Sequence, residues 1–195
     1  MVKTLLHMYL TILPLTISGI LNMVFTKTKL YQKHKSPIDR GRVLKDGKRI
    51  FGDNKTWIGF ISMVLISTCV HAASGVVVNT LNVSHCSDLY SVYNNTILYN
   101  SFVGFMFGLI YMLSELPNSF IKRRLDISAG KTDKGIKGLV FFIIDQIDSL
   151  VGVSLLIFLL SNITLWKSVG YVALGAITHI TVNLVLYLLK VRKNL

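Results

Sequence analysis

Two acidic residues interrupt an otherwise apolar stretch in the second half of this sequence. Asp145 and Asp148 lie within residues 138–160, where most of the other side chains are Phe, Ile, Leu and Val. In a helix, residues three apart share one face, so both carboxylates can reach the same ion. An aspartate near the centre of a membrane helix costs roughly 2.5 to 3.5 kcal/mol, and neighbouring carboxylates also repel each other. A positively charged partner must therefore offset this pair.

The residue types around the pair favour a hard divalent cation as that partner. Glu115 ends another apolar stretch, so three carboxylates could surround one chamber. The five histidines show no metal-ligand spacing, and packing or surface positions are expected for them. Oxygen ligands alone favour Mg²⁺ or Mn²⁺ over zinc, and these ions also bind substrate phosphates. The alternative is a buried ion pair with a basic side chain, but the apolar stretches contain no Lys or Arg.

A basic segment punctuated by glycine precedes the second apolar stretch. It reads Gly52-Asp53-Asn54-Lys55-Thr56-Trp57. A glycine turn before a helix can bind phosphate, because backbone N–H groups and the helix dipole point toward the anion. It is not a P-loop, because in that motif Lys and Ser or Thr directly follow the second glycine, whereas Asp53 and Asn54 separate Gly52 from Lys55 and Thr56 here. Adhesion to anionic lipid is the alternative, and it suits residues 27–35 better than residues 52–56.

A second polar segment follows the third apolar stretch. It contains a carboxylate, an amide, a hydroxyl and three cations, namely Glu115, Asn118, Ser119, Lys122, Arg123 and Arg124. Helical spacing would align Glu115, Ser119 and either Lys122 or Arg123. A Lys-Arg-Arg cluster beside a membrane often does no more than set topology. Together with the carboxylates, we interpret this one as a phosphate-binding segment.

The composition indicates which elements must position these residues. Hydrophobic residues make up 52% of the 195 residues and charged residues 15%, with a mean hydropathy of +0.57, which excludes an ordinary soluble domain. Five apolar stretches are long enough for a bilayer core of about 30 Å. They cover residues 5–25, 57–78, 97–114, 138–160 and 168–189. The sequence therefore predicts an all-α integral membrane protein, a single domain with five transmembrane helices.

The distribution of charge predicts the orientation of these helices. Lys and Arg number 21 against nine Asp and Glu, giving a net charge of +12. Nineteen of the 21 lie in residues 26–56, 115–137 and 190–195. The positive-inside rule then makes 26–56 and 115–137 two basic cytoplasmic loops, with the N-terminus outside and the active site facing the cytoplasm of a plasma-membrane protein. The basic charge faces lipid rather than nucleic acid, and a homodimer is left open.

Three motifs in this order resemble the CDP-archaeol synthase family, relatives of the CDP-diacylglycerol synthases. They are Pro37-Ile-Asp39 followed by Asp46-Gly47 and Gly52-Asp53-x-Lys55-Thr56-Trp57, then Glu115-x2-Asn118-Ser119-Phe-Ile-Lys122-Arg123-Arg124, and then Asp145-Gln-Ile-Asp148. The resemblance covers residues 37–153. The diacylglycerol enzymes carry a Gly-His-Gly-Gly segment before the aspartate pair that this chain lacks, which favours the archaeol branch. The Pro-Gly expected in the second loop reads Ser128-Ala129-Gly130 here.

The resemblance implies a reaction and a division of labour. CTP and 2,3-bis-O-geranylgeranyl-sn-glycerol 1-phosphate would give CDP-archaeol and pyrophosphate, with Mg²⁺, or Mn²⁺, as cofactor. We expect catalytic roles for Asp145, Asp148, Lys122 and Arg123, and metal binding by Glu115 with both aspartates. Nucleotide binding is expected of Gly52, Asp53, Lys55, Thr56, Asn118, Ser119 and Arg124.

Other functions fit parts of the pattern. The same reaction on phosphatidic acid would need the same residues. A small transporter of divalent cations or anions would also have carboxylates in its spans, but such proteins often show paired repeats, and these five spans are dissimilar. A CDP-alcohol phosphotransferase would need an Asp-x3-Asp arrangement that the sequence lacks.

Overall fold

The computed structural model describes residues 2–92, 94–131 and 133–190, and in these ranges the fold is helical. The helices are α1 (Val2–Phe25), α2 (Lys29–His34), α3 (Trp57–Thr80), the 3-10 helix η1 (Ser84–Cys86), α4 (Ile97–Arg124), α5 (Gly135–Leu160) and α6 (Leu165–Leu188). Five of them, α1, α3, α4, α5 and α6, are long and apolar enough to cross a membrane. The predicted all-α fold with five candidate spans is confirmed. The described ranges contain no β-strand, only the two isolated β-bridges Pro37–Thr56 and Val43–Arg49.

Threonine starts three of the long helices. The side-chain oxygens of Thr56, Thr96 and Thr164 accept hydrogen bonds from backbone N–H groups three residues later, at 3.2 to 3.3 Å. Such a cap satisfies one of the unpaired N–H groups of a helix start and stabilises it by about 1 kcal/mol. The starts of α3, α4 and α6 are therefore encoded locally.

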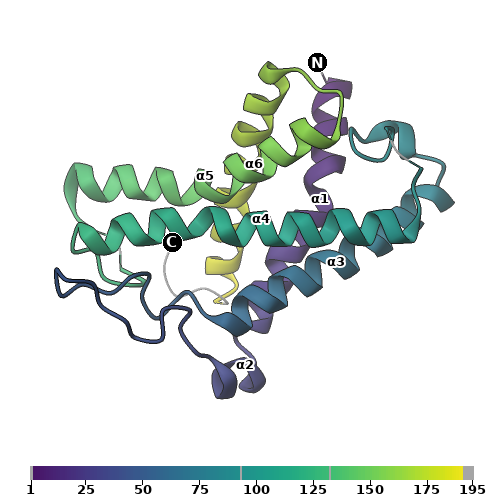
Figure 1. Cartoon of the computed structure of the whole chain (residues 1–195). Coiled ribbons are helices and arrows are strands. Elements are labelled where there is room, and N and C mark those ends of the chain that lie inside the picture. Colours follow the sequence, from purple (N-terminus) through teal and green to yellow (C-terminus); the bar gives the residue numbers. More distant parts are fainter. Residues whose placement is uncertain (1, 93, 132, 191–195) are drawn as a thin grey trace.

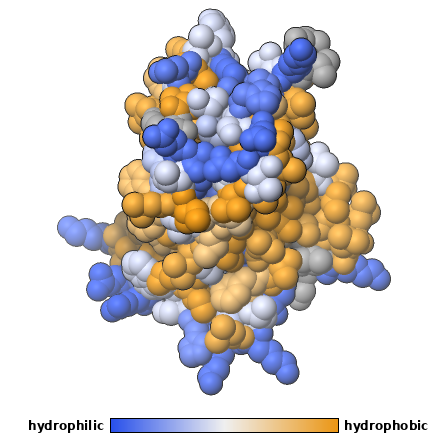
Figure 2. Space-filling model, turned by 90° about the vertical axis from the view of Figure 1, so that its right-hand side faces the viewer, coloured by the Kyte–Doolittle hydropathy of each residue, from blue (hydrophilic) through white to orange (hydrophobic). Residues whose placement is uncertain are grey.

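The surface matches a bilayer environment. Large apolar side chains are exposed along all five long helices; Leu98 and Trp166, for example, are 82% and 84% exposed. An apolar band crosses the middle of the molecule, with hydrophilic residues gathered above and below it (Figure 2). The interior core includes Phe107, Met63 and Ile157, which are almost completely buried. Apolar side chains thus occupy both the core and the band that would contact lipid.

Helices α3 and α4 lie side by side (Figure 1), and glycines on α4 allow their backbones to approach closely. A methyl group added at Gly104 would lie 2.5 Å from the carbonyl oxygen of Ser67, and one added at Gly108 would lie 2.7 Å from Cα of Val64. Small residues four apart are the usual means of close helix contact in membranes. The pair therefore fixes the position of α4.

Replacing Gly104 with valine should lower the free energy of unfolding by about 3 kcal/mol or more, because the added atoms meet backbone that cannot move aside. Thermal unfolding in detergent measures this change. Gly19→Ala on α1 is the control, since nothing lies within 4 Å of its added methyl group. A Gly104→Val variant that unfolds at the wild-type temperature would contradict this role.

The largest difference from the predicted spans lies in the third. The third span was expected to end at residue 114, with a loop over 115–137, but α4 continues to Arg124 with Pro117 inside it. Proline removes one helical N–H and usually ends or kinks a helix. Here the last turns are held by tertiary contacts, since Arg124 bonds to Asp46 and to the carbonyl oxygen of Arg49. The residues from Glu115 to Arg124 therefore lie on a helix rather than a loop.

Candidate active site

A cavity of about 640 Å³ opens at the end of the molecule that carries residues 26–56 and 122–137, called here the basic end. We name this cavity the polar chamber. It is lined by residues of α1, α4, α5 and α6 and of two connecting segments, the first at residues 26–56 and the second at residues 125–134. Eight predicted site residues line it, namely Lys55, Glu115, Asn118, Ser119, Lys122, Arg123, Asp145 and Asp148. Residues from three separate motifs are thus brought together by the fold.

Asn118 joins the two aspartates. Its Nδ2 atom donates to Asp145 Oδ1 and to Asp148 Oδ2, each at 2.7 Å. Asn118 is buried on α4, and its Oδ1 atom has no hydrogen-bond partner among the described residues. Because both aspartates lie on α5, the packing of α4 against α5 builds this contact. The two carboxylates therefore converge on one point, as their spacing predicted.

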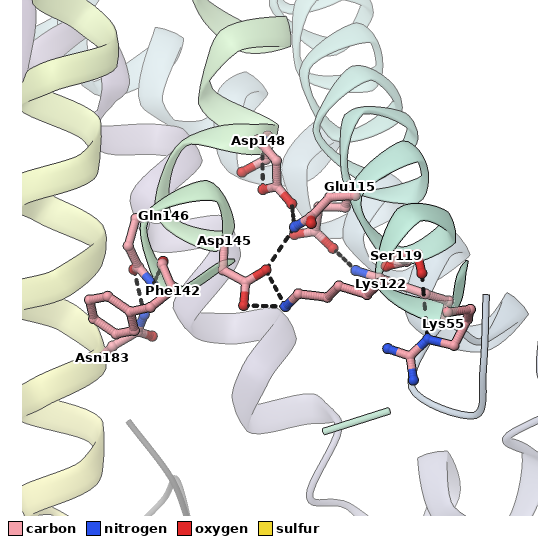
Figure 3. Close-up of polar contacts among 12 residues, drawn as sticks. Lys55, Glu115, Ser119, Lys122, Phe142, Asp145, Gln146, Asp148 and Asn183 are labelled. Carbon is pink, nitrogen blue, oxygen red and sulfur yellow. Dashed lines mark hydrogen bonds and ion pairs between the residues drawn. The ribbon is translucent and has the colours of Figure 1, made fainter. Parts of the chain in front are cut away.

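Two lysines neutralise the carboxylates in the polar chamber. Lys122 Nζ pairs with both carboxylate oxygens of Asp145, and Lys55 Nζ pairs with Glu115 (Figure 3). Burial alone would lower the pKa of Lys55, but the Glu115 carboxylate holds this pKa above its ordinary value, so the ammonium stays charged at neutral pH. Three carboxylates thus face two ammonium groups, which is the ion-pair arrangement that the sequence analysis treated as the alternative to a metal.

The expected ring of three carboxylates is not formed. Within the described ranges no three His, Cys, Asp or Glu side chains are grouped to hold a metal ion, and Glu115 is paired with Lys55. The aspartate pair still fits Mg²⁺, which commonly takes only one or two carboxylates and completes its shell with water and substrate phosphates. The unpaired Oδ1 atom of Asn118 adds a further oxygen beside them. The fit therefore rests on Asp145, Asp148 and Asn118, and a ligand role for Glu115 stays a prediction.

The predicted phosphate cradle over residues 52–56 is only partly directed at the polar chamber. Lys55 lines it, but Gly52 and Asp53 line a separate hollow of about 280 Å³. Thr56 is buried, where its hydroxyl caps α3 and bonds to the Tyr31 hydroxyl at 2.9 Å. Because its hydroxyl is engaged in these two contacts, Thr56 has a structural role. Gly52 has a φ of +96°, which glycine adopts without strain, and it packs against Ala129.

Arg124 also has a different place from the one expected. It binds Asp46 and the carbonyl oxygen of Arg49, and so ties the end of α4 to the first connecting segment rather than lining the polar chamber. Asp53 pairs with Arg49 at 2.9 Å on the surface. Both residues therefore hold the segment in place, and neither reaches the aspartate pair.

Asp39 organises this segment, and the sequence analysis included it only in a motif. Its buried carboxylate accepts two hydrogen bonds from Arg49 and three from the backbone N–H groups of Gly41, Phe51 and Gly52. Burial opposes ionisation, but these donors together hold the pKa of Asp39 well below its ordinary value. In the sequence, the signal that could have identified Asp39 is a carboxylate within a segment that is otherwise basic. Through Gly52, Asp39 positions Lys55 three residues later.

Asp39→Asn should open this segment, because the change removes an ion pair and leaves Arg49 without its main partner. Hydrogen bonds to charged groups are worth about 1.5 to 3 kcal/mol, so tryptic cleavage at Arg40 or Arg42 should rise at least about tenfold. Because the pKa of Asp39 is lowered by folding, its contribution to stability is full well above the unfolded pKa of about 3.9. This contribution is lost progressively as the pH falls from there through the folded pKa. Wild-type protection should therefore stay constant between about pH 6 and 8. Asp126→Asn, at an exposed ion pair with Lys48, is the control, and equal cleavage of both variants would contradict this role.

Among the chamber residues that were not predicted from the sequence are two hydrogen-bonded pairs on α4, α5 and α6. Tyr111 Oη and His179 Nε2 are hydrogen-bonded at 2.9 Å, and Asn183 donates to Gln146 Oε1 at 3.3 Å. All four residues line the polar chamber. His179 was expected to have a packing or surface position. A lone polar residue such as His179 in an apolar stretch is the sequence signal for such a position. The sequence does not show which way its side chain points, because that depends on how α6 packs.

Comparisons with known proteins show the family of this chain. The model of the CarS-like CDP-archaeol synthase family matches residues 1–194. The chain is 30% identical over 161 residues to a CDP-archaeol synthase of Saccharolobus islandicus, covering 82% of this chain and 81% of that one. It is 31% identical over 166 residues to that of Methanoculleus marisnigri, covering 81% and 88%. A match to the Thermococcus onnurineus enzyme is 36% identical over 107 residues, 55% of this chain and 56% of that one.

A solved structure shares the fold. It is described as an intramembrane enzyme for archaeal membrane lipids biosynthesis, and it superposes with a TM-score of 0.60 at 20% identity, covering 90% of this chain and 92% of that one. The fold, the polar chamber and the sequence relatives lead to one conclusion: this chain belongs to the CDP-archaeol synthase family and is a CTP-dependent cytidylyltransferase of membrane lipid biosynthesis.

Proposed function

We propose that the polar chamber binds CTP and the phosphate of an isoprenoid glycerol ether lipid and joins them. The observation that carries this proposal is the convergence of Asp145 and Asp148 on Asn118, with Lys55 and Lys122 beside them in one chamber. Carboxylates and lysines in one cavity suit a substrate that brings both phosphates and a metal ion.

In the proposed reaction an oxygen of the lipid phosphate attacks the α-phosphorus of CTP. A new P–O bond forms there, the bond from the α-phosphorus to the bridging oxygen of the β-phosphate breaks, and pyrophosphate leaves. The attacking phosphate is already ionised near neutral pH, since its second pKa is about 6, so no general base is required. The protein contributes by positioning the two anions and stabilising their charge.

The basic side chains supply most of this stabilisation. Lys55 and Lys122 end in the polar chamber, and Arg123 lines it from α4. Lys55 and Lys122 can exchange their present carboxylate contacts for a phosphate oxygen, and Arg123 can exchange its contact with the carbonyl oxygen of Ser119. Hydrogen bonds between charged groups are about twice as strong as neutral ones. Ser119, also on the wall, offers a hydroxyl to orient a phosphate.

Asp145 and Asp148 would hold Mg²⁺ or Mn²⁺, with Asn118 beside them. When bound, the ion neutralises charge on the phosphates and stabilises charge that develops during transfer. For this to happen Lys122 must release Asp145. Asp145 would therefore have Lys122 as its partner in one state and the metal ion in the other.

The proposed orientation places the basic end in the cytoplasm, where CTP is available, and the apolar band in the plasma membrane. The excess of Lys and Arg in residues 26–56 and 122–137 supports this orientation. The polar chamber lies at this end, within reach of both a soluble nucleotide and a lipid headgroup.

Turnover of radiolabelled CTP with purified chain in vesicles tests the proposal. Ether and ester lipid phosphates with matched chains are supplied side by side. The expected result is a labelled CDP-lipid from the ether lipid, with release of pyrophosphate. Preference for the ester lipid would favour phosphatidate as substrate, whereas no product from either lipid, together with cation or anion flux across the vesicles, would favour a transporter.

A further inference from the structure

A second cavity, of about 80 Å³, continues from the polar chamber into the helix bundle between α1, α5 and α6. We call it the apolar groove. Its wall includes Ile12, Leu15 and Ile20 of α1, Val153 and Ile157 of α5, and Val182 of α6. Both cavities are lined by Met23, Tyr111, His179 and Asn183, so they adjoin at these residues.

The apolar groove has the length and direction of one lipid chain. On α1 it extends from Ile12 to Met23, which at 1.5 Å per residue is about 16 Å. One leaflet of a bilayer contributes about half of the 30 Å hydrocarbon core. Met23 lies at the polar chamber and Ile12 lies deeper, so the groove runs from headgroup level toward the middle of the bundle.

The apolar groove is also reachable and incompletely filled. Ile20 and Val182, which line it from α1 and α6, are only partly buried, so a chain can enter from the surrounding bilayer between these helices. Protein interiors rarely contain voids much larger than a water molecule, and apolar voids stay dry. A void lined by aliphatic side chains therefore suits a hydrocarbon ligand.

Tyr111 and His179 mark the boundary between the two cavities. Their side chains are hydrogen-bonded, with the rings perpendicular and their centroids 6.1 Å apart. Tyr111 stands one helical turn before Glu115 and two before Asn118 on the same face of α4. A molecule with its phosphate at the aspartates and its chain in the apolar groove must pass this pair.

We propose that the apolar groove binds one isoprenoid chain of the lipid phosphate, with the Tyr111–His179 pair at the junction of headgroup and chain. This inference rests on the proposed function, because the occupant is its lipid substrate. The polar chamber then selects the phosphate, and the groove selects the chain and fixes how far the phosphate reaches.

Gly19→Leu tests this assignment. Gly19 lines the apolar groove, and nothing lies within 4 Å of an added Cβ, so the new side chain fills the groove without a clash at the backbone. The KM for the long-chain lipid phosphate should rise at least tenfold, with the KM for CTP unchanged. With a short-chain lipid phosphate, which does not need the groove, Gly19→Leu should react as fast as the wild-type protein.

The matched control is Leu21→Phe, which adds bulk to the exposed face of the same helix. Binding of CTP and the unfolding temperature, measured for both variants, establish that they are folded. An unchanged KM for the long-chain lipid in Gly19→Leu would overturn the assignment. If wild type forms no CDP-lipid from any lipid phosphate, the proposed function fails instead.

Photocrosslinking gives a readout that does not depend on turnover. A lipid phosphate with a diazirine near the end of one chain should label groove residues of α1, α5 or α6 in the wild-type protein. Unlabelled lipid phosphate should prevent this labelling, and a neutral lipid with the same chains should not. Equal competition by both would mean that the groove holds ordinary bilayer lipid, and labelling confined to the outer helix faces would also exclude the proposed site.

Discussion

Asp145→Asn is expected to reduce cytidylyl transfer by about a thousandfold or more, with the protein still inserted in the membrane. The change removes one of the two carboxylates that meet at Asn118 and leaves Lys122 without its partner. Losing a group that stabilises charge in the transition state commonly costs 10²- to 10³-fold, and losing a metal ligand adds to this. Initial rates with CTP and lipid phosphate measure the effect.

Insertion should be unaffected, because removing an intramembrane charge lowers the cost of insertion. The amount of protein in the membrane fraction and its unfolding temperature are the corresponding measurements. Asp126→Asn, at an exposed carboxylate of the basic end, serves as the control and should keep full activity. Full activity in both Asp145→Asn and Asp148→Asn would remove the metal assignment.

Lys122→Met should produce two opposite changes. In the absence of nucleotide, affinity for Mn²⁺ should rise about tenfold, because the ion no longer displaces an ammonium group from Asp145. The KM for CTP should rise at least tenfold, because a phosphate loses its cationic partner. Titration calorimetry of Mn²⁺ without nucleotide and steady-state kinetics measure the two effects separately.

Lys122→Arg is the matched control for charge. It should leave Mn²⁺ affinity close to wild type, since a cation still faces Asp145, while the different shape of the guanidinium alters the KM for CTP. Unchanged Mn²⁺ binding in Lys122→Met, together with unchanged kinetics for both substrates, would refute the role of Lys122 at this site.

The lysines also explain how the chain tolerates its carboxylates before substrate arrives. From the sequence we expected a positive partner for Asp145 and Asp148, and we inferred a metal ion because the apolar stretches contain no Lys or Arg. Lys122, from the last turns of α4, provides it for Asp145, while Lys55, from the segment before α3, pairs with Glu115. Asp148 instead accepts hydrogen bonds from Asn118 and from the backbone N–H of Ser149. The Lys122–Asp145 ion pair and the proposed metal site would therefore be alternative states of Asp145.

Much of the fold followed from local signals. A run of apolar residues long enough for a bilayer predicts a helix wherever it falls, since backbone polar groups must be satisfied within the segment. Threonine caps fixed the starts of α3, α4 and α6. The end of α4 was not predictable in this way, because contacts from Arg124 to a distant segment carry the helix past Pro117.

By itself, the sequence determined five membrane-length helices, a convergent pair of aspartates and the motifs that relate the chain to its family. These depend on composition, helical periodicity and spacing, which act within one segment. Only the tertiary structure decided that Lys55 holds Glu115, that Asp39 orders the first connecting segment, that Thr56 is structural and that Tyr111 meets His179. The Lys55–Glu115 and Tyr111–His179 contacts join different parts of the bundle, so they depend on which helix faces pack together. The contacts of Asp39 and Thr56 lie within residues 26–56, but they join residues 13 and 25 positions apart, beyond the reach of helical periodicity.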